Sequence, residues 1–456
     1  MTSSEGFVKY MAPGARGHLV GIGGVSMSPL AEVLARRGLV ISGSDMRESE
    51  TTRHLAELGI DVKIGHAPEN IDGAEFIVRT AAARDDNVEI AEARRRGVPV
   101  FERAEAWGAI MREYKNAICI SGTHGKTTTT SMVTHILMAA EKDPTVMIGG
   151  TLPLLQSCYR VGHGETIVLE SCEYYNSVHS FFPTVAVVLN VDEDHLDFFK
   201  DIEDIKRSFR KFCELTPPDG TVVYNADDAN TVSALAGIDR RVITFGLGDS
   251  ADVRAIDIEL GRETSFKVIY KGVEFCRLKL RLTGLHNVKN ALAAIAVAIC
   301  GHVPGSAVVE GLTAFSGADR RLQFKGKING ADIYDDYAHN PGELDALFAA
   351  VGQMGYKRVV CAFQPHTYSR TKLRMEDVGK QLAKPDVLVL AEIYAARETN
   401  TFGISSRDLQ ARLPGSEYCA DLGELESKLR EIASPGDIIL TVGAGDVYRV
   451  GEKLAE

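Results

Sequence analysis

Residues 118–130, which read ICISGTHGKTTTT, are the most informative stretch of this chain. The stretch begins with mostly apolar residues, turns at two glycines and continues into a segment with the apolar spacing of a helix. A strand, a glycine turn and a helix start form the context of a phosphate-binding loop, in which amides and the helix N-terminus face phosphate oxygens. The candidate nucleotide-binding residues of this loop are Gly122, Thr123, His124, Gly125, Lys126, Thr127 and Thr128.

Two side chains of this loop predict its chemistry. Lys126 can reach a transferred phosphate, and the Thr127 hydroxyl is placed for Mg²⁺. The loop is short, because only two residues separate Gly122 from Gly125. A Gly-Lys-Thr tripeptide alone is a weak signal, and a lysine near a helix start is usually a solvated surface residue. The phosphate interpretation is favoured by the preceding strand and by one apolar helix face with Met132, Val133, Ile136 and Leu137.

The whole-chain composition limits the classes of protein that fit. The length of 456 residues predicts two or three domains, and 45% hydrophobic with 25% charged residues is ordinary for a globular protein. A net charge of −11 makes a nucleic acid partner unfavourable. We expect a cytoplasmic protein without membrane insertion, because there is no membrane-length apolar run and no signal-peptide core. The eight cysteines form no C-x-x-C pair and predict neither a zinc ribbon nor a disulfide framework.

Strand-like apolar runs alternate with helical patterns along the chain, which predicts the α/β class with parallel sheets. We expect three domains, spanning residues 1–114, 115–316 and 317–456, with the linker before the last one within 315–321. In the third domain, strands are expected at 359–363, 387–391 and 438–442.

The first domain shows a Rossmann-like pattern. A predicted strand at 18–22 leads into a glycine turn, a helix at 29–37, and a second strand at 39–42 that ends before Asp45. Such a turn is often no more than a tight connection, and Ser26 at the third position of the pattern weakens an NAD interpretation. The nearby acid favours a nucleotide site, whose candidate residues are Gly21, Gly23, Gly24, Ser26 and Asp45.

Two further predicted strands of the second domain end in chemically useful residues. The strand at 166–169 precedes Glu170, and the strand at 185–189 runs into an acidic segment that contains His195 and ends at Asp197. Ligands bind beyond the carboxyl ends of parallel strands, so Thr127, Glu170 and His195 are candidate metal ligands at one sheet edge. The alternatives are a solvated acid at Glu170 and a hydrogen-bonded loop histidine at 195.

Other candidates lie later in the chain. Asn287 and Asn290 are one helical turn apart, so both amides can face one ligand, although Asn287 also suits a helix N-cap. Arg321 is either surface charge or a phosphate contact made on domain closure. Asp336 and His339 crowd one turn after a strand, which favours a ligand site over simple capping.

Together these motifs resemble the Mur ligase family of bacterial cell-wall synthesis. The resemblance is carried by GTHGKTTTT, LESCEYYNS, LNVDEDHLD, HNVKN, ADRRLQ and YDDYAHNPGE, and it spans residues 18–450. It implies a Rossmann-like N-terminal domain that binds a UDP substrate, a central P-loop ATPase domain with a parallel sheet, and a Rossmann-like C-terminal ligase domain. GIGGVSMSPLA, SGSDMRES, GHAPENI, FQPHTYSRT and ISSRDL are most similar to the family member that adds L-alanine.

The resemblance also implies an activity. ATP and Mg²⁺ would serve as cofactors in joining L-alanine to the carboxylate of UDP-N-acetylmuramate through an acyl phosphate. The implied roles are β/γ-phosphate binding by Lys126, Mg²⁺ binding by Thr127 and Glu170, a second metal at His195, and adenine contacts by Asn287 and Asn290. Further implied roles are phosphate binding by Arg321, ribose binding by Asp336, and substrate binding by Gly21, Gly23, Gly24, Ser26, Asp45, His66 and His339.

The chain departs from the family pattern after the strand at 166–169. After this strand the chain reads ESCEYY, so either Glu170 or Glu173 can be the metal ligand. The 25-residue spacing from Glu170 to His195 favours Glu170. The segment that holds a carbamylated lysine in sister ligases has Lys206, Arg207, Arg210 and Lys211 here, and none is assigned. The alternative functions are a recycling ligase that adds a whole tripeptide, an NAD-dependent oxidoreductase and a non-catalytic nucleotide switch.

Overall fold

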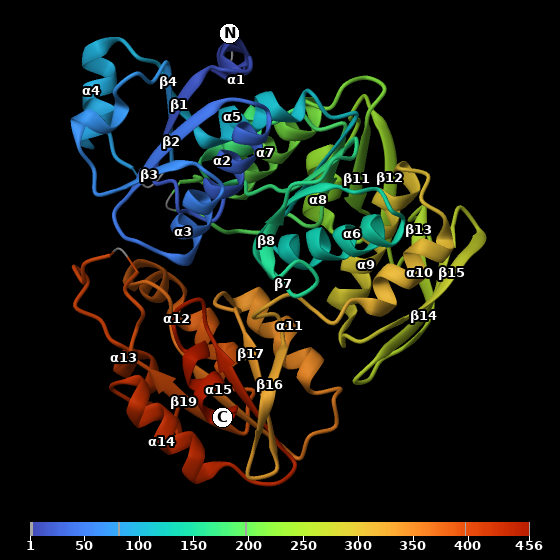
Figure 1. Ribbon diagram of the computed structural model, residues 1–456. Coiled ribbons are helices and arrows are strands. Elements are labelled where there is room, and N and C mark those ends of the chain that lie inside the picture. Colours follow the sequence, from blue (N-terminus) through green and yellow to red (C-terminus); the bar gives the residue numbers. More distant parts are fainter. Residues whose placement is uncertain (1–2, 81–82, 197, 397, 456) are drawn as a thin grey trace. The chain divides into compact units, whose positions relative to one another are not determined.

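The computed structural model describes residues 3–80, 83–196, 198–396 and 398–455 (Figure 1). These residues form two compact units. The first runs up to Arg254 and includes Val268–Cys276 and Asn290–Leu312, and the second comprises Ala255–Lys267, Arg277–Lys289 and the chain from Thr313 onward. No helix in the described ranges has both the length and the apolar character needed to cross a membrane.

The N-terminal sheet has five parallel strands in the order β3-β2-β1-β4-β5. The strands are β1 (Arg16–Val20), β2 (Val40–Asp45), β3 (Asp61–Ile64), β4 (Phe76–Arg79) and β5 (Val100–Glu102). The strand order reverses at β1, so the turn that follows β1 lies where doubly wound sheets bind ligands. The helices of this region are α1 (Ser3–Phe7), η1 (Val8–Tyr10), α2 (Ser28–Arg36), α3 (Glu50–Glu57), η2 (Pro68–Ile71), α4 (Val88–Arg96) and α5 (Arg103–Met111).

The central sheet has ten strands in the order β15-β14-β13-β12-β11-β10-β6-β9-β7-β8. They are β6 (Asn116–Ser121), β7 (Thr145–Leu152), β8 (Ser157–Arg160), β9 (Thr166–Glu170), β10 (Val185–Val188), β11 (Thr221–Asn225), β12 (Arg241–Gly246), β13 (Val253–Glu259), β14 (Thr264–Tyr270) and β15 (Val273–Leu280). The accompanying helices are α6 (Lys126–Ala139), η3 (Tyr174–Ser180), α7 (Ile202–Glu214), α8 (Ala229–Leu235), α9 (Leu285–Cys300) and α10 (Gly305–Ala314). β6 pairs in parallel with β10 on one side and with β9 on the other.

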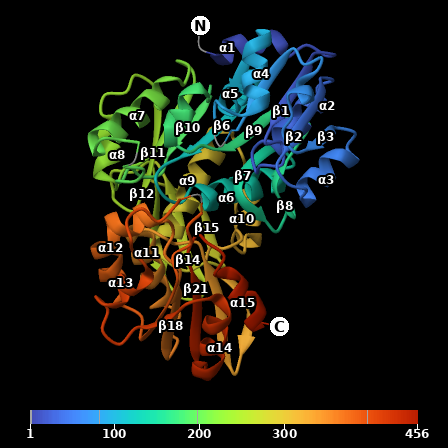
Figure 2. The same ribbon diagram turned by 90° about the vertical axis from the view of Figure 1, so that its left-hand side faces the viewer.

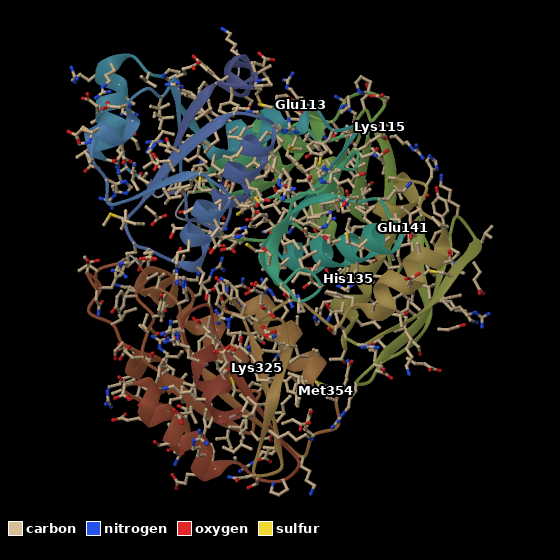
Figure 3. The ribbon with its side chains drawn as sticks, viewed as in Figure 1. Glu113, Lys115, His135, Glu141, Lys325 and Met354 are labelled. Atoms are coloured by element: carbon tan, nitrogen blue, oxygen red, sulfur yellow. The ribbon has the colours of Figure 1, made fainter. Side chains whose placement is uncertain are left out.

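Helix α6 is buried although it begins with a lysine, four threonines and a serine. Three of its hydroxyls are satisfied within the helix, because Thr130, Ser131 and Thr134 each donate to the carbonyl four residues earlier at 2.8 Å. The far end packs tightly on α10, where a Cβ added to Gly311 would come within 2.7 Å of the His135 carbonyl oxygen. Figure 3 labels His135 on this helix.

The C-terminal sheet has six strands in the order β16-β17-β21-β18-β19-β20, all parallel except the β16–β17 pair. The strands are β16 (Gln323–Ile328), β17 (Ala331–Asp336), β18 (Arg358–Phe363), β19 (Val387–Ala391), β20 (Glu417–Cys419) and β21 (Asp437–Val442). The helices are α11 (Pro341–Val351), α12 (Tyr368–Leu382), α13 (Ser406–Gln410), α14 (Leu422–Ile432) and α15 (Tyr448–Ala455). Figure 2 shows these helices around β18 and β21.

The α/β class with three largely parallel sheets is confirmed. A single core cluster includes Phe76 of the N-terminal sheet and Leu169 of the central sheet, so these two sheets share apolar packing. Two sequence expectations need correction. Asp45 is the last residue of β2 rather than a residue beyond it, and Asn287 lies inside α9 rather than at its N-cap.

Candidate active site

The phosphate loop joins β6 to α6 in the first unit. Gly125 precedes the helix with a φ of 83°, a left-handed conformation that glycine adopts without strain. The amides of Gly125, Lys126, Thr127 and Thr128 have no hydrogen-bond acceptor among the residues that the structure describes. Together with the helix dipole, these unused amides make the turn suitable for a phosphate group.

The Lys126 ammonium folds back over this loop. Its Nζ lies 2.5 Å from the Gly122 carbonyl oxygen, 3.2 Å from the Thr123 carbonyl oxygen and 3.1 Å from a Glu173 carboxylate oxygen. Burial alone would lower the pKa of Lys126, but nearby charges, chiefly Glu173, outweigh it and raise that pKa. The loop therefore holds a permanent cation against its own backbone.

Asn190, which the sequence analysis did not select, braces the loop. Its carbonyl oxygen accepts the Thr123 amide at 3.1 Å, and its side-chain oxygen accepts the His124 amide at 2.8 Å. Its side-chain nitrogen returns a bond to the His124 carbonyl at 3.1 Å. The sequence held one signal for this role of Asn190. It is an asparagine that follows a buried strand by two residues, and that strand lies next to the one that leads into the phosphate loop.

The two glutamates after β9 have different partners. One Glu170 oxygen accepts the Thr127 hydroxyl at 3.0 Å, and the other accepts the Gly149 amide at 2.6 Å. Glu173 is buried and pairs with Lys126 at 3.1 Å. Glu170 and Thr127 thus place two hard oxygen donors side by side, which is the kind of donor set that Mg²⁺ prefers.

His195 lies in the loop after β10. It has a φ of 53°, and its ring stacks on Tyr174 with 4.3 Å between centroids. Asp197 of the same motif lies outside the described residues. Because β10, β6 and β9 are neighbours, the segments that carry His195, the phosphate loop and Glu170 follow adjacent strands of one sheet. No cluster of three or more His, Cys, Asp or Glu side chains suited to a metal occurs in the described part of the chain.

The two asparagines on α9 make different contacts. Asn290 accepts the Thr129 hydroxyl at 3.3 Å, and its side-chain oxygen would lie 2.5 Å from a Cβ added to Gly125. Asn290 therefore packs against the phosphate loop itself. The Asn287 side chain donates to the Thr283 carbonyl at 2.8 Å, which joins it to the chain before α9.

The N-terminal glycine turn uses its amides differently. All four amides of residues 21–24 donate inside the domain: two to the Ser44 carbonyl, one to an Asp45 carboxylate oxygen at 2.9 Å, and one to the Gly21 carbonyl. In the described structure, only the Val25 and Ser26 amides of this turn lack an acceptor. The glycines shape the turn, and their amides are not available to a ligand.

His66 follows β3 beside this turn and belongs to a buried polar network. Its Nδ1 lies 2.9 Å from the Glu89 oxygen Oε2, which also accepts the Ser44 hydroxyl at 2.6 Å, and the other Glu89 oxygen accepts the Asn70 side-chain amide at 2.6 Å. Burial opposes the charge of Glu89, but hydrogen bonds from His18 of β1, Ser44 and Asn70 lower its pKa to about 2. Glu89 is therefore an ionised anchor for His66 and the end of β2.

In the second unit, Asp336 ends β17 and is almost completely buried. Its carboxylate accepts the Leu322 amide at 2.7 Å and the Ala338 amide at 2.8 Å. Burial raises the pKa of Asp336 to about 6, although Arg321 and these amides favour its charged form. Arg321 lies 4.0 Å from Glu343, so its guanidinium makes only a long ion pair.

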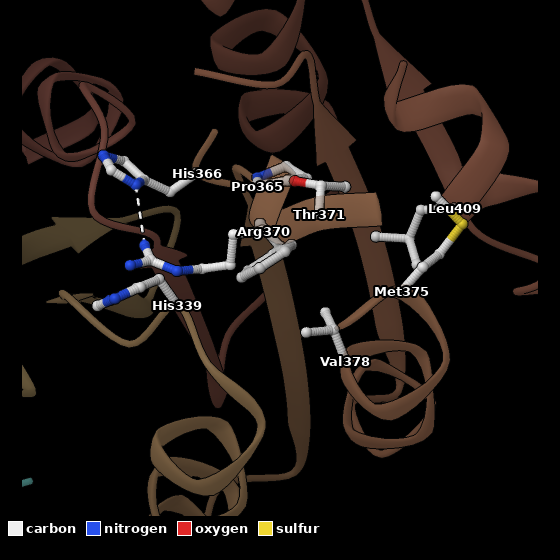
Figure 4. A pocket seen from close by; sticks show the side chains of 9 residues that line it. His339, Pro365, His366, Arg370, Thr371, Met375, Val378 and Leu409 are labelled. Carbon is white, nitrogen blue, oxygen red and sulfur yellow. Dashed lines mark hydrogen bonds between the residues drawn. The ribbon is translucent and has the colours of Figure 1, made fainter. Parts of the chain in front are cut away.

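His339 follows Asp336 and lines a hollow in the second unit with Pro365, His366, Arg370 and Thr371 (Figure 4). The His339 and His366 rings are 5.9 Å apart, and Arg370 lies 3.1 Å from the His366 ring nitrogen. Burial, with smaller contributions from the charges of His339 and Arg370, lowers the pKa of His366 to about 4. A guanidinium beside imidazoles suits a small anion such as a carboxylate.

Comparison with known protein families assigns most of the chain. The Mur ligase family, catalytic domain, matches residues 16–115, the Mur ligase middle domain matches 120–298, and the Mur ligase, glutamate ligase domain, matches 320–445. The chain belongs to the Mur ligase family. The family resemblance inferred from the sequence is thereby confirmed.

Individual Mur ligases are similar over nearly the whole chain. The UDP-N-acetylmuramate–L-alanine ligase of Caldanaerobacter subterraneus is 42% identical and that of Clostridium novyi 44%, each match covering 96% of this chain and 97% of the relative. The crystal structure of UDP-N-acetylmuramate-alanine ligase from Thermotoga maritima superposes with a TM-score of 0.80 at 30% identity, covering 96% of this chain and 98% of that one. A murein peptide ligase from Psychrobacter arcticus, with a TM-score of 0.70 and 21% identity over 97% and 98% of the two chains, shares the fold.

Proposed function

We propose that this Mur ligase joins L-alanine to the carboxylate of UDP-N-acetylmuramate at the expense of ATP. The observation that carries the proposal is the 42–44% identity, over 96% of the chain, to ligases named for this reaction. The phosphate loop adds physical support, because it offers unused amides and a cation, Lys126, at the start of α6. These features suit the phosphoryl transfer that activates a carboxylate.

The proposed chemistry has two steps. The substrate carboxylate attacks the γ-phosphate of ATP, which forms an acyl phosphate and expels ADP. The amine of L-alanine then attacks the acyl carbon, loses a proton and expels inorganic phosphate. Both nucleophiles belong to substrates, so the protein contributes positioning and charge stabilisation rather than a covalent intermediate.

Lys126 is the residue to which we assign the largest effect. Its ammonium would stabilise the negative charge on the β- and γ-phosphates, while the amides from Gly125 to Thr128 hold their oxygens. Asn190 keeps the loop in shape through its bonds to Thr123 and His124. Because Glu173 already pairs with Lys126, it positions the ammonium rather than binding a metal in this assignment.

Thr127 and Glu170 would hold Mg²⁺, since their oxygens lie 3.0 Å apart and Mg²⁺ retains several waters in such sites. A cation bound there would neutralise charge on the transferred phosphoryl group. We assign His195 to a second cation site, for which its place after β10 beside β6 is the support.

The remaining assignments follow the family pattern. We propose that Asn287 and Asn290 serve the adenine end of ATP, and that Arg321 and Asp336 serve its phosphate and ribose. We assign binding of the UDP part of the substrate to Ser26, Asp45, His66 and the glycine turn. We assign His339 to substrate binding in the C-terminal domain. We also propose that the chain works as three domains with borders near 114 and 316, in the cytoplasm.

The test is phosphate release from ATP with each substrate omitted in turn, combined with product mass. We expect release only when UDP-N-acetylmuramate, L-alanine and Mg²⁺ are all present, and a product heavier by one alanine residue. A product formed only with a tripeptide would instead identify a recycling ligase. Turnover that ignores both substrates would point to a nucleotide switch, and a change in nicotinamide absorbance to an oxidoreductase.

A further inference from the structure

Arg103 ties the start of α5 to the N-terminal glycine turn. Its guanidinium donates to the Ser26 hydroxyl, and Trp107, one turn later, donates its ring N–H to the Ser26 carbonyl at 3.2 Å. Trp107 is 1% exposed, so the helix is fixed by packing as well as by these bonds. The cation is thus placed at one point of the turn by a rigid element.

Among the carboxylates of the described residues, only the charge of the adjacent Glu102 favours the protonated form of this guanidinium, and it does so without an ion pair. The adjacent Glu102 accepts from Arg79 at 2.6 Å, and Glu105 closes the helix start by accepting the Glu102 amide at 2.8 Å. In the described part of the chain Arg103 takes part in no ion pair, although it is only partly exposed to solvent. Burial lowers the pKa of Arg103, which indicates that its positive charge is poorly solvated.

The turn that Arg103 contacts offers an anion few donors, because only its Val25 and Ser26 amides lack an acceptor among the described residues. The amides of residues 21–24 are used internally, and Asp45 adds a negative charge beside Gly23. No lysine or arginine lies within residues 21–26. A cation from elsewhere would strengthen the binding of an anionic ligand at this position, and Arg103 is already in contact with the turn.

We propose that Arg103 is a binding residue for the diphosphate of the sugar nucleotide, with the Ser26 hydroxyl orienting its guanidinium. The inference rests on the proposed function, because it takes a UDP sugar as the ligand. The lactyl carboxylate of the same substrate is the other anionic group that could meet a guanidinium. The diphosphate is favoured because Ser26 lies at the carboxyl edge of the N-terminal sheet, whereas the carboxylate must react at the phosphate loop after β6.

The experiment compares Arg103→Met and Arg103→Lys with the wild-type enzyme. A hydrogen-bonded charge contact predicts that Arg103→Met raises KM for UDP-N-acetylmuramate by roughly 10- to 100-fold with kcat within about threefold. Inhibition by UDP, which has the diphosphate but no carboxylate, should weaken by a similar factor. Arg103→Lys should fall between the two, because lysine retains the charge without the planar fork.

Two controls separate this role from a structural one. KM for ATP should stay unchanged in both variants, and Arg95→Met should match the wild type, because Arg95 is exposed and paired with Glu92. If Arg103→Met fails to fold, Arg103→Lys decides: a raised KM at an unchanged melting temperature supports the role, and an unchanged KM overturns it.

The remaining outcomes are also decisive. Weaker binding of UDP-N-acetylmuramate with unchanged inhibition by UDP would place Arg103 at the carboxylate and overturn the proposal. Unchanged values for both ligands would overturn it as well. If the wild-type enzyme makes no alanine product, the proposed function fails, and calorimetry with UDP alone then tests Arg103: UDP binding that Arg103→Met weakens supports the site, and equal or absent UDP binding overturns it.

Discussion

The N-terminal glycine turn and the phosphate loop look alike in sequence and differ in structure. Both connect a parallel strand to a helix and both contain glycines with positive φ, at Gly21 and at Gly125. The first turn spends the amides of residues 21–24 on its own domain, whereas the second leaves those of residues 125–128 without an internal acceptor. A glycine pattern therefore specifies a sharp turn, and the partners of its amides decide whether it can bind an anion.

The two turns also differ in charge. A carboxylate, Asp45, supports the first turn, and a second carboxylate, Glu89, anchors the strand end behind it. The second turn is supported by the neutral Asn190 and holds the largely covered cation Lys126, which pairs with Glu173. We therefore propose that phosphoryl transfer takes place at the second turn and that the first turn serves ligand binding.

The largest effect is expected from removing the cation of the second turn. Lys126→Ala should lower phosphate release by about 10³-fold or more, because a preorganised charge at the transferred group is lost. The fold should survive, as judged by circular dichroism and melting. Lys115→Ala is the control, since Lys115 is exposed before β6 and paired with Glu165 (Figure 3). Retained ligase activity in Lys126→Ala would contradict the contrast in charge.

The next effect tests the open amides of the phosphate loop. Gly125→Ala places a Cβ 2.5 Å from the Asn290 side-chain oxygen at a φ of 83°, so the loop must move. We expect KM for ATP to rise roughly 10- to 100-fold. Gly355→Ala, with a φ of 75° and no atom within 4 Å of the new Cβ, shares the backbone strain without the contact. Both should lose about 1–2 kcal/mol of stability, and equal ATP affinity in the two variants would count against the loop assignment.

A smaller effect is expected on the stability of the N-terminal domain at acidic pH. The pKa of Glu89 falls from 4.5 to about 2 on folding, so its contribution to stability is complete above pH 4.5 and is lost as the pH falls toward 2. Glu89→Gln should lower the free energy of unfolding by about 2 kcal/mol at neutral pH. The difference from wild type should shrink between pH 4.5 and 2 in denaturant titrations. Glu57→Gln, at an exposed position of α3, should show no comparable difference, and a gap that persists at low pH would contradict the role of Glu89.

The smallest expected effect distinguishes two roles of Asp45 in the first turn, its hydrogen-bond acceptor and its negative charge. Asp45→Ala removes the oxygen that accepts the Gly23 amide, and KM for the sugar nucleotide should rise about fivefold as the turn loosens. Asp45→Asn keeps an acceptor and should stay within about twofold of wild type in the same steady-state assay. Equal losses in both variants would show that the charge, rather than the hydrogen bond, matters.

Much of the architecture was predictable because it depends on local pattern. The strand expected at 387–391 is β19, and the strands expected at 359–363 and 438–442 differ from β18 and β21 by one residue. The order of Gly122 to Thr128 specified a turn at a helix start, which needs only glycine and local hydrogen bonding. Glu170 was preferred over Glu173 from spacing, and its bond to Thr127 supports the same choice.

The rest of the site depends on contacts between residues that are far apart in the chain. Asn190 reaches the phosphate loop across 66 positions, and Arg103 reaches Ser26 across 77. Asn190 stands in LNVDEDHLD, but nothing in that motif shows that its side chain turns back to the phosphate loop, and an arginine at a helix start looks like an ordinary surface residue.

The strand–turn–helix units and the family could be inferred from residue order, because periodicity, glycines and ordered motifs are local properties of the chain. The tertiary structure alone decided which amides stay open, which glutamate neutralises Lys126 and which arginine meets the first turn. The physical reason is that each of these outcomes depends on hydrogen-bond and charge partners, which become neighbours only when the sheets have assembled.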